Sequence, residues 1–269
     1  MPIWLLNQSI FQKPIFAMTS PINLATFKPL YTPKQDRPMH LVVFGSGHGS
    51  NLEALLEERK KNPGCFEIKA LLSDRPCRFQ DLGHLEKIPV IDHSFQRFVA
   101  LKGLEKKSAA EIRLEYDEEA VRLLLECAAL HQFSIDLILL AGYMRLVKAP
   151  LLSHFNIINV HPADLTILDG EGKRKYIGAD SVYLALQAGE TKTSSCVFLV
   201  DEGVDNGPIL VTGPSVDYTE GYPLTKQKAL LHQAKQKVQS DLPACLTAIK
   251  MIAEGRIAID SDNKVHISH

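Results

Sequence analysis

Short runs of β-branched and other apolar residues recur along the chain from Met39 onward, and stretches with helical spacing separate them. Between the first two runs, residues 51–61 place Leu52, Leu55 and Leu56 on one face, which predicts a helix directly after a strand. Alternation of this kind is typical of βαβ units around a parallel sheet. We therefore predict an α/β protein with an open, mostly parallel, twisted sheet and helices on both faces. The predicted strands are residues 40–45, 67–72, 88–91, 136–141, 157–160, 196–200 and 209–212.

Three further helices are predicted from their end signals and spacing. Ser108 and Glu111 form a capping box ahead of apolar residues at near-helical spacing. A shorter helix is expected over residues 181–188. The last predicted helix covers residues 224–254, and we expect an interruption at Pro243, because proline inside a helix removes a hydrogen bond and clashes with the preceding turn.

Residues 1–38 differ from the rest of the chain, with six prolines, scattered aromatic residues and no helical period. We predict an N-terminal extension outside the core, followed by one domain over residues 39–269. An alternative is that the natural start is Met39 and that the preceding residues come from an over-extended reading frame. The stretch lacks the basic segment and the long apolar segment of a secretory signal.

The 30 Lys and Arg residues against 31 Asp and Glu leave a formal net charge of −1 on 269 residues. Without an overall positive charge we expect neither nucleic acid nor a membrane as a partner, so an anionic ligand must be held locally. We expect small-molecule substrates and a monomer or homodimer. Five cysteines without a C-x-x-C pair argue against a disulfide framework or a structural zinc site, and they favour a cytoplasmic location.

A glycine-rich loop over residues 45–51, GSGHGSN, lies between the first predicted strand and the first helix. Its glycines let backbone N–H groups turn toward an anion at the positive end of a helix, which favours a phosphate site. Close packing of a tight turn is the alternative reason for them. The loop is not a Walker A motif and is an imperfect dinucleotide fingerprint. Asp74 follows the next strand where a ribose-binding acid would lie, so a nicotinamide cofactor is a minor alternative.

Asn159 and His161 lie at the end of the fifth predicted strand, two positions apart, so that in an extended chain they point to the same face. Open α/β sheets bind their ligands at this carboxyl edge. A turn-rich acidic loop over residues 201–208 connects two later strands and could return a carboxylate to the same edge. Taken alone, the histidine is more often a structural residue and the acidic loop a solvated turn.

Four motifs occur in order along the chain: GSGHGSNL at residues 45–52, LAGYMRL at 140–146, NVHP at 159–162 and DEGVDNGP at 201–208. Together they resemble the phosphoribosylglycinamide formyltransferases, a family within the folate-dependent formyltransferase superfamily, and the likeness extends over residues 39–256. The resemblance implies a Rossmann-related formyltransferase domain. It also implies an enzyme of purine biosynthesis that transfers a formyl group from 10-formyltetrahydrofolate, its co-substrate, to glycinamide ribonucleotide without a metal.

The resemblance further implies roles for individual residues. In the family, an amide and a protonated imidazole bind the oxyanion of the reacting formyl group, and a carboxylate keeps the imidazole charged or shuttles the proton. The matching positions are Asn159, His161 and Asp205 for catalysis, Gly49, Ser50 and Asn51 for the substrate phosphate, and Arg113, Met144, Arg145 and Leu146 for folate.

The chain departs from the family pattern in several places. The sequence ADLT follows Pro162 where the family has Ser and two leucines, and the family's histidines are absent from residues 177–181. The family's ribose-binding glutamate falls near Val238, unless a shift in alignment recruits Glu220. We therefore expect formyl transfer with weakened recognition of glycinamide ribonucleotide. A different amine acceptor and a non-catalytic folate or nucleotide binder are the alternatives.

An insertion near the site adds three consecutive cations, Lys173, Arg174 and Lys175. They either contact a phosphate or solvate a loop, and we favour the loop.

Overall fold

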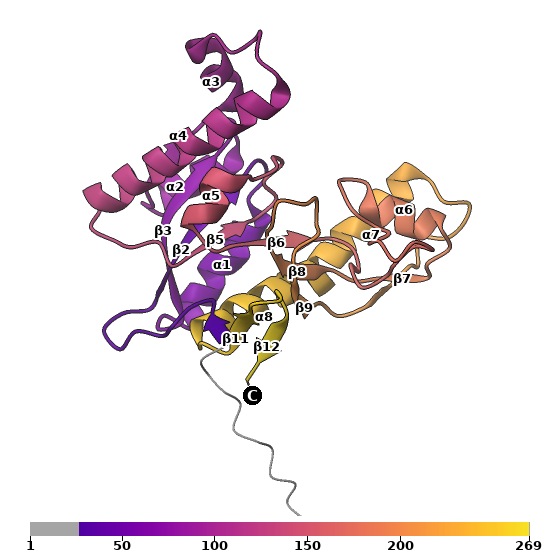
Figure 1. Cartoon of the computed structure of the whole chain (residues 1–269). Helices are drawn as coiled ribbons and strands as arrows, with labels where there is room; N and C mark the ends of the chain where they lie inside the picture. The colour runs from indigo at the N-terminus through magenta and orange to yellow at the C-terminus, as the bar shows by residue number, and fades with distance from the viewer. Residues whose placement is uncertain (1–26, 269) are drawn as a thin grey trace, which may run out of the picture.

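The computed structural model describes residues 27–268, which form an α/β fold around a twisted sheet (Figure 1). Within these residues the main sheet has seven strands in the order β4-β3-β2-β5-β6-β8-β9. The first five are parallel, β8 runs antiparallel to them, and β9 at the edge runs antiparallel to β8. The predicted open, mostly parallel sheet is therefore confirmed. Its strands are β2 (Met39–Gly45), β3 (Phe66–Ser73), β4 (Val90–Asp92), β5 (Leu137–Leu140), β6 (Ile157–His161), β8 (Cys196–Leu199) and β9 (Ile209–Thr212).

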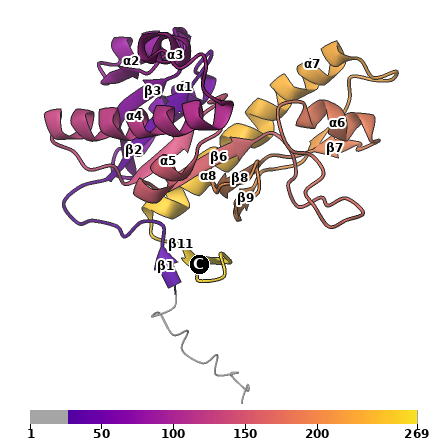
Figure 2. The ribbon, with the colours of Figure 1, turned by 45° about the horizontal axis from the view of Figure 1, so that its top comes forward.

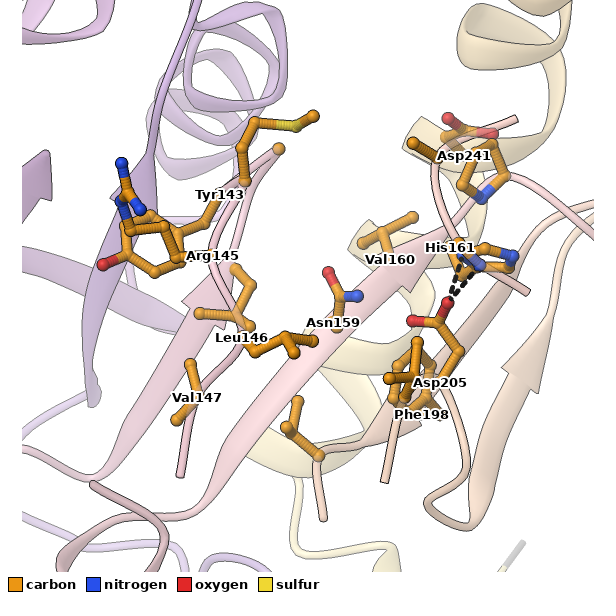
Figure 3. Close-up of a pocket in the computed structure, with 18 of the residues that line it drawn as sticks. Tyr143, Arg145, Leu146, Val147, Asn159, Val160, His161, Phe198, Asp205 and Asp241 are labelled. Carbon is orange, nitrogen blue, oxygen red and sulfur yellow. Dashed lines mark hydrogen bonds and ion pairs between the residues drawn. The ribbon is translucent and has the colours of Figure 1, made fainter. Parts of the chain in front are cut away.

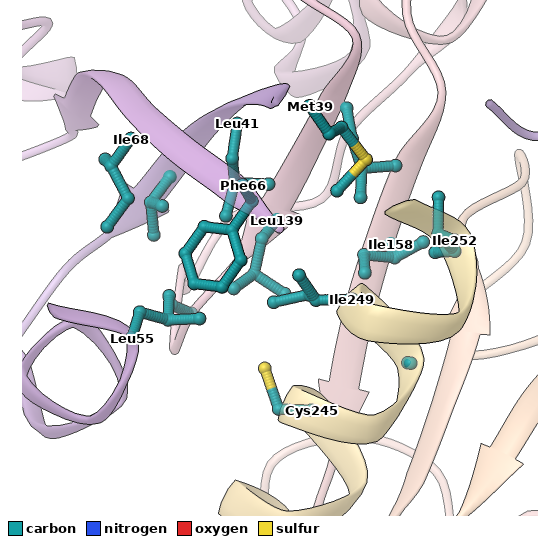
Figure 4. Close-up of a cluster of buried hydrophobic side chains, with 14 of the residues drawn as sticks. Met39, Leu41, Leu55, Phe66, Ile68, Leu139, Ile158, Cys245, Ile249 and Ile252 are labelled. Carbon is teal, nitrogen blue, oxygen red and sulfur yellow. The ribbon is translucent and has the colours of Figure 1, made fainter. Parts of the chain in front are cut away.

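Helices cover both faces of this sheet, because alternate residues of each strand point to opposite sides. In β2, Leu41 and Val43 face a cluster that includes α1, α2 and α8 (Figure 4), whereas Val42 and Phe44 face α4 and α5. Burial on both faces explains why the strands are continuous apolar runs in the sequence. The helices are α1 (Ser50–Lys61), α2 (Arg78–Leu85), α3 (Phe95–Lys102), α4 (Ala109–Leu130), α5 (Ala149–His154), α6 (Ser181–Gln187), α7 (Lys226–Gln236) and α8 (Leu242–Ala253).

The capping box predicted at the start of α4 is present. The Ser108 hydroxyl accepts a hydrogen bond from the Glu111 backbone, and the Glu111 carboxylate accepts one from the Ser108 backbone. The sequence did not predict α2, α3 or α5, which have eight residues or fewer. Segments this short complete few turns and show no clear helical period, although α6, with seven residues, was predicted.

The long C-terminal helix is interrupted, as predicted, but just before the proline. A π-helical segment, Lys237–Asp241, joins α7 to α8. Pro243 lies in the first turn of α8, directly after this π-helical segment, where the hydrogen-bond ladder already changes its spacing. The π-helical turn therefore absorbs the disruption, and it alters which side chains of this helix face the sheet edge.

Residues 27–38, predicted to lie outside the core, pack against the domain instead. Strand β1 (Phe27–Pro29) pairs with β11 (Ile257–Asp260), which also pairs with β12 (Val265–Ile267). Leu30 and Tyr31 are buried in the cluster shared by α1 and α8. Their apolar side chains explain the docking of this proline-rich segment, which pairs at a sheet edge. The remainder of the predicted extension, residues 1–26, lies outside the described residues.

A lobe of α6, α7, β7 (Lys192–Thr193) and β10 (Val216–Asp217) projects from the antiparallel edge of the sheet (Figures 1 and 2). Helices α6 and α7 pack together through Val182, Leu186 and Ala229. Among residues 27–268, no helix has the length and apolar character that a membrane crossing requires.

Candidate functional site

A pocket of about 380 Å³ opens at the carboxyl ends of β5 and β6, a size that suits a small ligand. Figure 3 shows Tyr143 and Arg145 on one side of it, His161, Asp205 and Asp241 on the other, and Asn159 between them. These side chains come from β6, from the segment after β5, from the acidic loop 201–208 and from the C-terminal helix. The pocket therefore lies at the sheet edge where the sequence predicted the site.

His161 and Asp205 meet in this pocket although they lie far apart in the chain. His161 Nδ1 is 3.4 Å from Asp205 Oδ2, and the two side chains are only 5% and 13% exposed. His161 Nε2 lies 2.8 Å from the carbonyl oxygen of Tyr176. A carbonyl oxygen only accepts hydrogen bonds, so Nε2 carries a proton and donates it. Nδ1 is therefore the nitrogen through which His161 can exchange a proton with Asp205 or with a ligand.

Asn159 occupies the same face of β6, two residues before His161, and its side-chain amide points into the pocket (Figure 3). An amide N–H and a protonated imidazole both donate hydrogen bonds. Together they can stabilise negative charge that develops on an oxygen between them. The predicted convergence of an amide, an imidazole and a carboxylate is thus present in the structure.

The glycine loop meets the packing requirement considered from the sequence, and it leaves the start of α1 open. A Cβ on Gly45 would lie 2.6 Å from the Phe79 ring, so this glycine is needed for packing against α2, whereas Gly47 has open space around it. Gly49 caps α1 in the left-handed conformation, with φ of 79°, and offers no side chain to the helix end. The first N–H groups of α1 thus lack helical acceptors, an arrangement that suits an anion.

Of the three residues predicted to bind phosphate, Asn51 lines the pocket. Its Oδ1 is buried and makes no hydrogen bond within the described part of the chain. Gly49 and Ser50 directly precede it at the start of α1. Since a buried polar atom without a partner is costly and an amide oxygen only accepts hydrogen bonds, Asn51 Oδ1 suits a hydrogen-bond donor of a ligand, such as a hydroxyl or an amine, rather than a phosphate oxygen.

The four residues predicted to contact folate lie together near the end of β5. Met144, Arg145 and Leu146 line the pocket. Arg113, on α4, donates a hydrogen bond to the Leu146 carbonyl and lines an adjacent groove of about 580 Å³ with Leu146. Arg145 donates to Asp74 at 2.9 Å and lies over the Phe95 ring, so its guanidinium fixes the turn after β5.

Asp74, the residue behind the nicotinamide alternative, is fully buried and does not line the pocket. Its carboxylate binds both Arg75 and Arg145. Burial alone would raise the pKa of Asp74, but hydrogen bonds from Arg75 and Ser46 and the charge of Arg145 bring it below its usual value. Because this carboxylate already accepts hydrogen bonds from two arginines and lies outside the pocket, it is poorly placed to bind a ribose hydroxyl. This argues against the nicotinamide alternative.

Asp117 is a second buried carboxyl group, on α4 one turn from Arg113. It accepts a hydrogen bond from the Lys148 backbone at 2.7 Å. Burial raises the pKa of Asp117 to about 7, only partly offset by this hydrogen bond and by the charge of Arg113. In residues 27–268, no group of three or more His, Cys, Asp or Glu side chains is arranged to hold a metal ion.

Among the pocket residues not foreseen from the sequence are three polar ones on the C-terminal helix. Gln233, Lys237 and Asp241 recur every fourth residue across α7 and the π-helical segment, so they share a face, and all three line the pocket. Their spacing was the available signal. Burial raises the pKa of Asp241.

Neither candidate for the family's ribose-binding glutamate lines this pocket. Val238 is 65% exposed. The Glu220 carboxylate instead lies 3.3 Å from His232 Nδ1. The π-helical turn brings Lys237, next to Val238, to the pocket instead.

The three inserted cations behave differently from one another. Lys173 pairs with Glu171 at the surface, and the Lys175 ammonium lies 5.0 Å from the centre of the Tyr176 ring. These two agree with the loop interpretation. Arg174 is partly buried and donates to backbone carbonyls of the acidic loop, a contact that the sequence did not predict.

Comparisons with known proteins show which family this chain resembles. The formyl transferase family model matches residues 39–238. The phosphoribosylglycinamide formyltransferase of Bacillus subtilis is 30% identical over 197 residues, which cover 72% of this chain and 88% of that protein.

Solved structures share the fold. Glycinamide ribonucleotide transformylase 1 from Symbiobacterium toebii superposes with a TM-score of 0.66 at 24% identity, over 86% of this chain and 95% of that one. A formyltetrahydrofolate deformylase from Pseudomonas putida superposes with a TM-score of 0.64 at 18% identity, over 87% and 72% of the two chains.

Proposed function

Because the chain belongs to the formyl transferase family, we propose that it transfers a formyl group from 10-formyltetrahydrofolate to the amine of glycinamide ribonucleotide, a step of purine biosynthesis. The observation that carries this proposal is the meeting of Asn159, His161 and Asp205 in a pocket that also contains Asn51, from the N-terminus of α1. Reactive groups and an anion cradle in one pocket suit a phosphorylated amine. The Bacillus subtilis relative, named for this reaction, supports the choice of acceptor.

The reaction requires stabilisation of negative charge on the formyl oxygen and transfer of one proton from the amine to the folate nitrogen. The neutral amine attacks the formyl carbon, a C–N bond forms, and the carbonyl oxygen becomes an oxyanion. Asn159 and the Nδ1–H of His161 donate hydrogen bonds to that oxygen. The C–N bond to folate then breaks, and its nitrogen takes up a proton equivalent to the one the amine loses. His161 and Asp205 carry that proton.

The two substrates occupy different walls of the pocket. The acceptor phosphate binds at the start of α1, where Gly49, Ser50 and Asn51 provide backbone N–H groups and the Asn51 amide. Folate lies along the segment after β5, against Met144 and Leu146, with Arg113 at the adjoining groove. Arg145 supports this wall through Asp74 rather than through folate itself.

A different amine acceptor is the second candidate, and one observation favours it. Lys237 and Gln233 line the pocket, whereas Glu220 is paired with His232 and Val238 is exposed. A lysine ammonium only donates hydrogen bonds, so it prefers an anionic or carbonyl group to a ribose diol. An amino sugar nucleotide has such groups.

A panel of amines separates these candidates. The protein is incubated with 10-formyltetrahydrofolate and either glycinamide ribonucleotide, its riboside without phosphate, or an amino sugar nucleotide, while tetrahydrofolate release and formylated product are measured. We expect turnover of the ribonucleotide and a much higher KM for the riboside. Product from the amino sugar nucleotide alone would assign the second candidate. Release of formate without any amine, or binding without turnover, would contradict transfer.

A further inference from the structure

Arg174 binds the backbone of the loop that carries Asp205. Its Nη1 donates to the carbonyl oxygen of Asp205, and its Nη2 donates to that of Gly207 at 2.8 Å. A guanidinium holds its donors in a rigid plane, so two carbonyl acceptors fix both the position and the direction of the backbone. Arg174 does not itself line the pocket.

The backbone at Asp205 and Gly207 has an unusual conformation that further contacts must stabilise. Asp205 adopts a left-handed conformation, with φ of 48°, which is unfavourable for a residue with a side chain. Two residues later the backbone runs so close to β8 that a Cβ on Gly207 would lie 1.7 Å from the Leu199 carbonyl oxygen. The loop therefore has little room to approach β8 more closely, and the carbonyls that Arg174 binds flank this strained turn.

The segment that presents Arg174 also contacts the reactive pair directly. The carbonyl of Tyr176 accepts the hydrogen bond from His161 Nε2, and the Gly178 N–H donates to Asp205 Oδ2, each at 2.8 Å. Residues 174, 176 and 178 thus alternate along one short stretch and hold both His161 and the Asp205 loop.

This stretch is itself well anchored. Arg174 forms a β-bridge with Leu168. The Tyr176 ring is buried, and its hydroxyl donates to Glu190 at 2.8 Å. A guanidinium presented from such a support is pre-organised for its two acceptors.

We propose that Arg174 is a positioning residue for the formyl transfer: by binding the Asp205 and Gly207 carbonyls it keeps the Asp205 carboxylate within reach of His161 Nδ1, without touching either substrate. This inference rests on the proposed function. A residue of this kind affects the rate of the chemical step and leaves substrate affinity nearly unchanged.

The test compares Arg174→Ala with Lys173→Ala, a matched loss of a neighbouring cation whose ammonium pairs with Glu171 at the surface. For Arg174→Ala we expect kcat to fall roughly a hundredfold with KM for both substrates changed less than about threefold. Methylguanidinium added to the assay should restore part of the kcat, because it can occupy the vacated position. Arg174→Lys should recover only part of the activity, since an ammonium lacks the planar fork. Lys173→Ala should match the unmodified protein.

Amide hydrogen exchange provides a readout that does not depend on activity. Peptides covering residues 201–208 should exchange faster in Arg174→Ala than in Lys173→Ala, while those of β2 and β5 stay the same. Unchanged kcat, faster exchange throughout the sheet, or parallel losses in kcat and affinity would overturn the positioning role. A protein that shows the loop effect but formylates no amine would instead contradict the proposed function.

Discussion

The parallel half of the sheet and its antiparallel edge build the pocket by different means. The parallel half, β2 to β6, is held by apolar side chains buried on both faces, and it supplies the start of α1 and the segment after β5. At the antiparallel edge, the loops that carry Asp205 and Tyr176 are held near His161 by polar contacts. The proposed substrate-binding segments and the loop of Asp205 thus depend on different kinds of interaction, so substitutions can separate their effects.

The largest effect on kcat is expected from Asp205→Asn, at the antiparallel edge. The amide can still accept the Gly178 N–H but cannot hold a charge opposite His161, so kcat should fall about a thousandfold. His161→Ala should have a comparable effect. Folate affinity, measured by calorimetry, should stay within a few fold for both variants. Glu202→Gln, in the same loop, is the control, and unchanged turnover of Asp205→Asn would refute the assigned role.

A core substitution in the parallel half should lower the stability of the fold and leave kcat nearly unchanged. Leu139 is fully buried in β5, and Leu139→Ala should lower the free energy of unfolding by about 2–5 kcal/mol, measured by urea denaturation. Folded protein should keep nearly its normal kcat. The same change at Leu130, which is 77% exposed, should cost less than about 0.5 kcal/mol. Equal losses in the free energy of unfolding at Leu139 and Leu130 would contradict the dependence of the parallel half on its buried apolar side chains.

A charge at the anion cradle tests binding in the parallel half. Asn51→Asp places a negative charge at the start of α1, which favours the helix but repels a phosphate. KM for glycinamide ribonucleotide should rise about tenfold while kcat changes little. The riboside without phosphate serves as the control substrate. An equal rise in KM for that compound would show that Asn51 does not contact the phosphate.

A pH dependence of stability should originate in the parallel half, at Asp117. The pKa of this group is about 7 in the folded protein against 3.8 for the free side chain. Between these values the folded state keeps a proton that the unfolded chain has released, so stability falls as pH rises, by at most about 1.4 kcal/mol per pH unit. Asp117→Asn should flatten this slope in urea titrations at pH 4–7. An unchanged slope would assign it to other groups.

In the parallel half, the strands and the long helices were predictable from sequence, whereas the short helices were not. Residues 40–45 and 136–141 are apolar runs because both faces are buried, and the helices of at least eleven residues carry clear spacing or end signals. Helices α2, α3 and α5 are too short to display a period. The packing of residues 27–38 depends on Leu30 and Tyr31 meeting a cluster formed by distant segments, and local sequence does not encode such contacts.

Parts of the candidate site were likewise predictable from sequence, and other parts were not. Asn159 and His161 could be placed on one face from strand geometry alone, and the acidic loop 201–208 was a candidate to bring a carboxylate to them, but the choice of Asp205 within that loop was implied only by family resemblance. Arg174 contacts backbone carbonyls, which leave no trace in residue identity. Lys237 reaches the pocket through a π-helical turn, for which the sequence offered only the nearby Pro243.

The dependence of His161 on the Tyr176 carbonyl and of Asp205 on the Gly178 N–H has a consequence for heating. The Tyr176 ring packs in a small apolar cluster with Ala163 and Ala185 that is separate from the two large clusters of the sheet, so these contacts can open while the sheet stays intact. Thermal inactivation should therefore precede the loss of circular dichroism, and cooling from that interval should restore full activity. The enzyme would then have a temperature limit for turnover below its melting point.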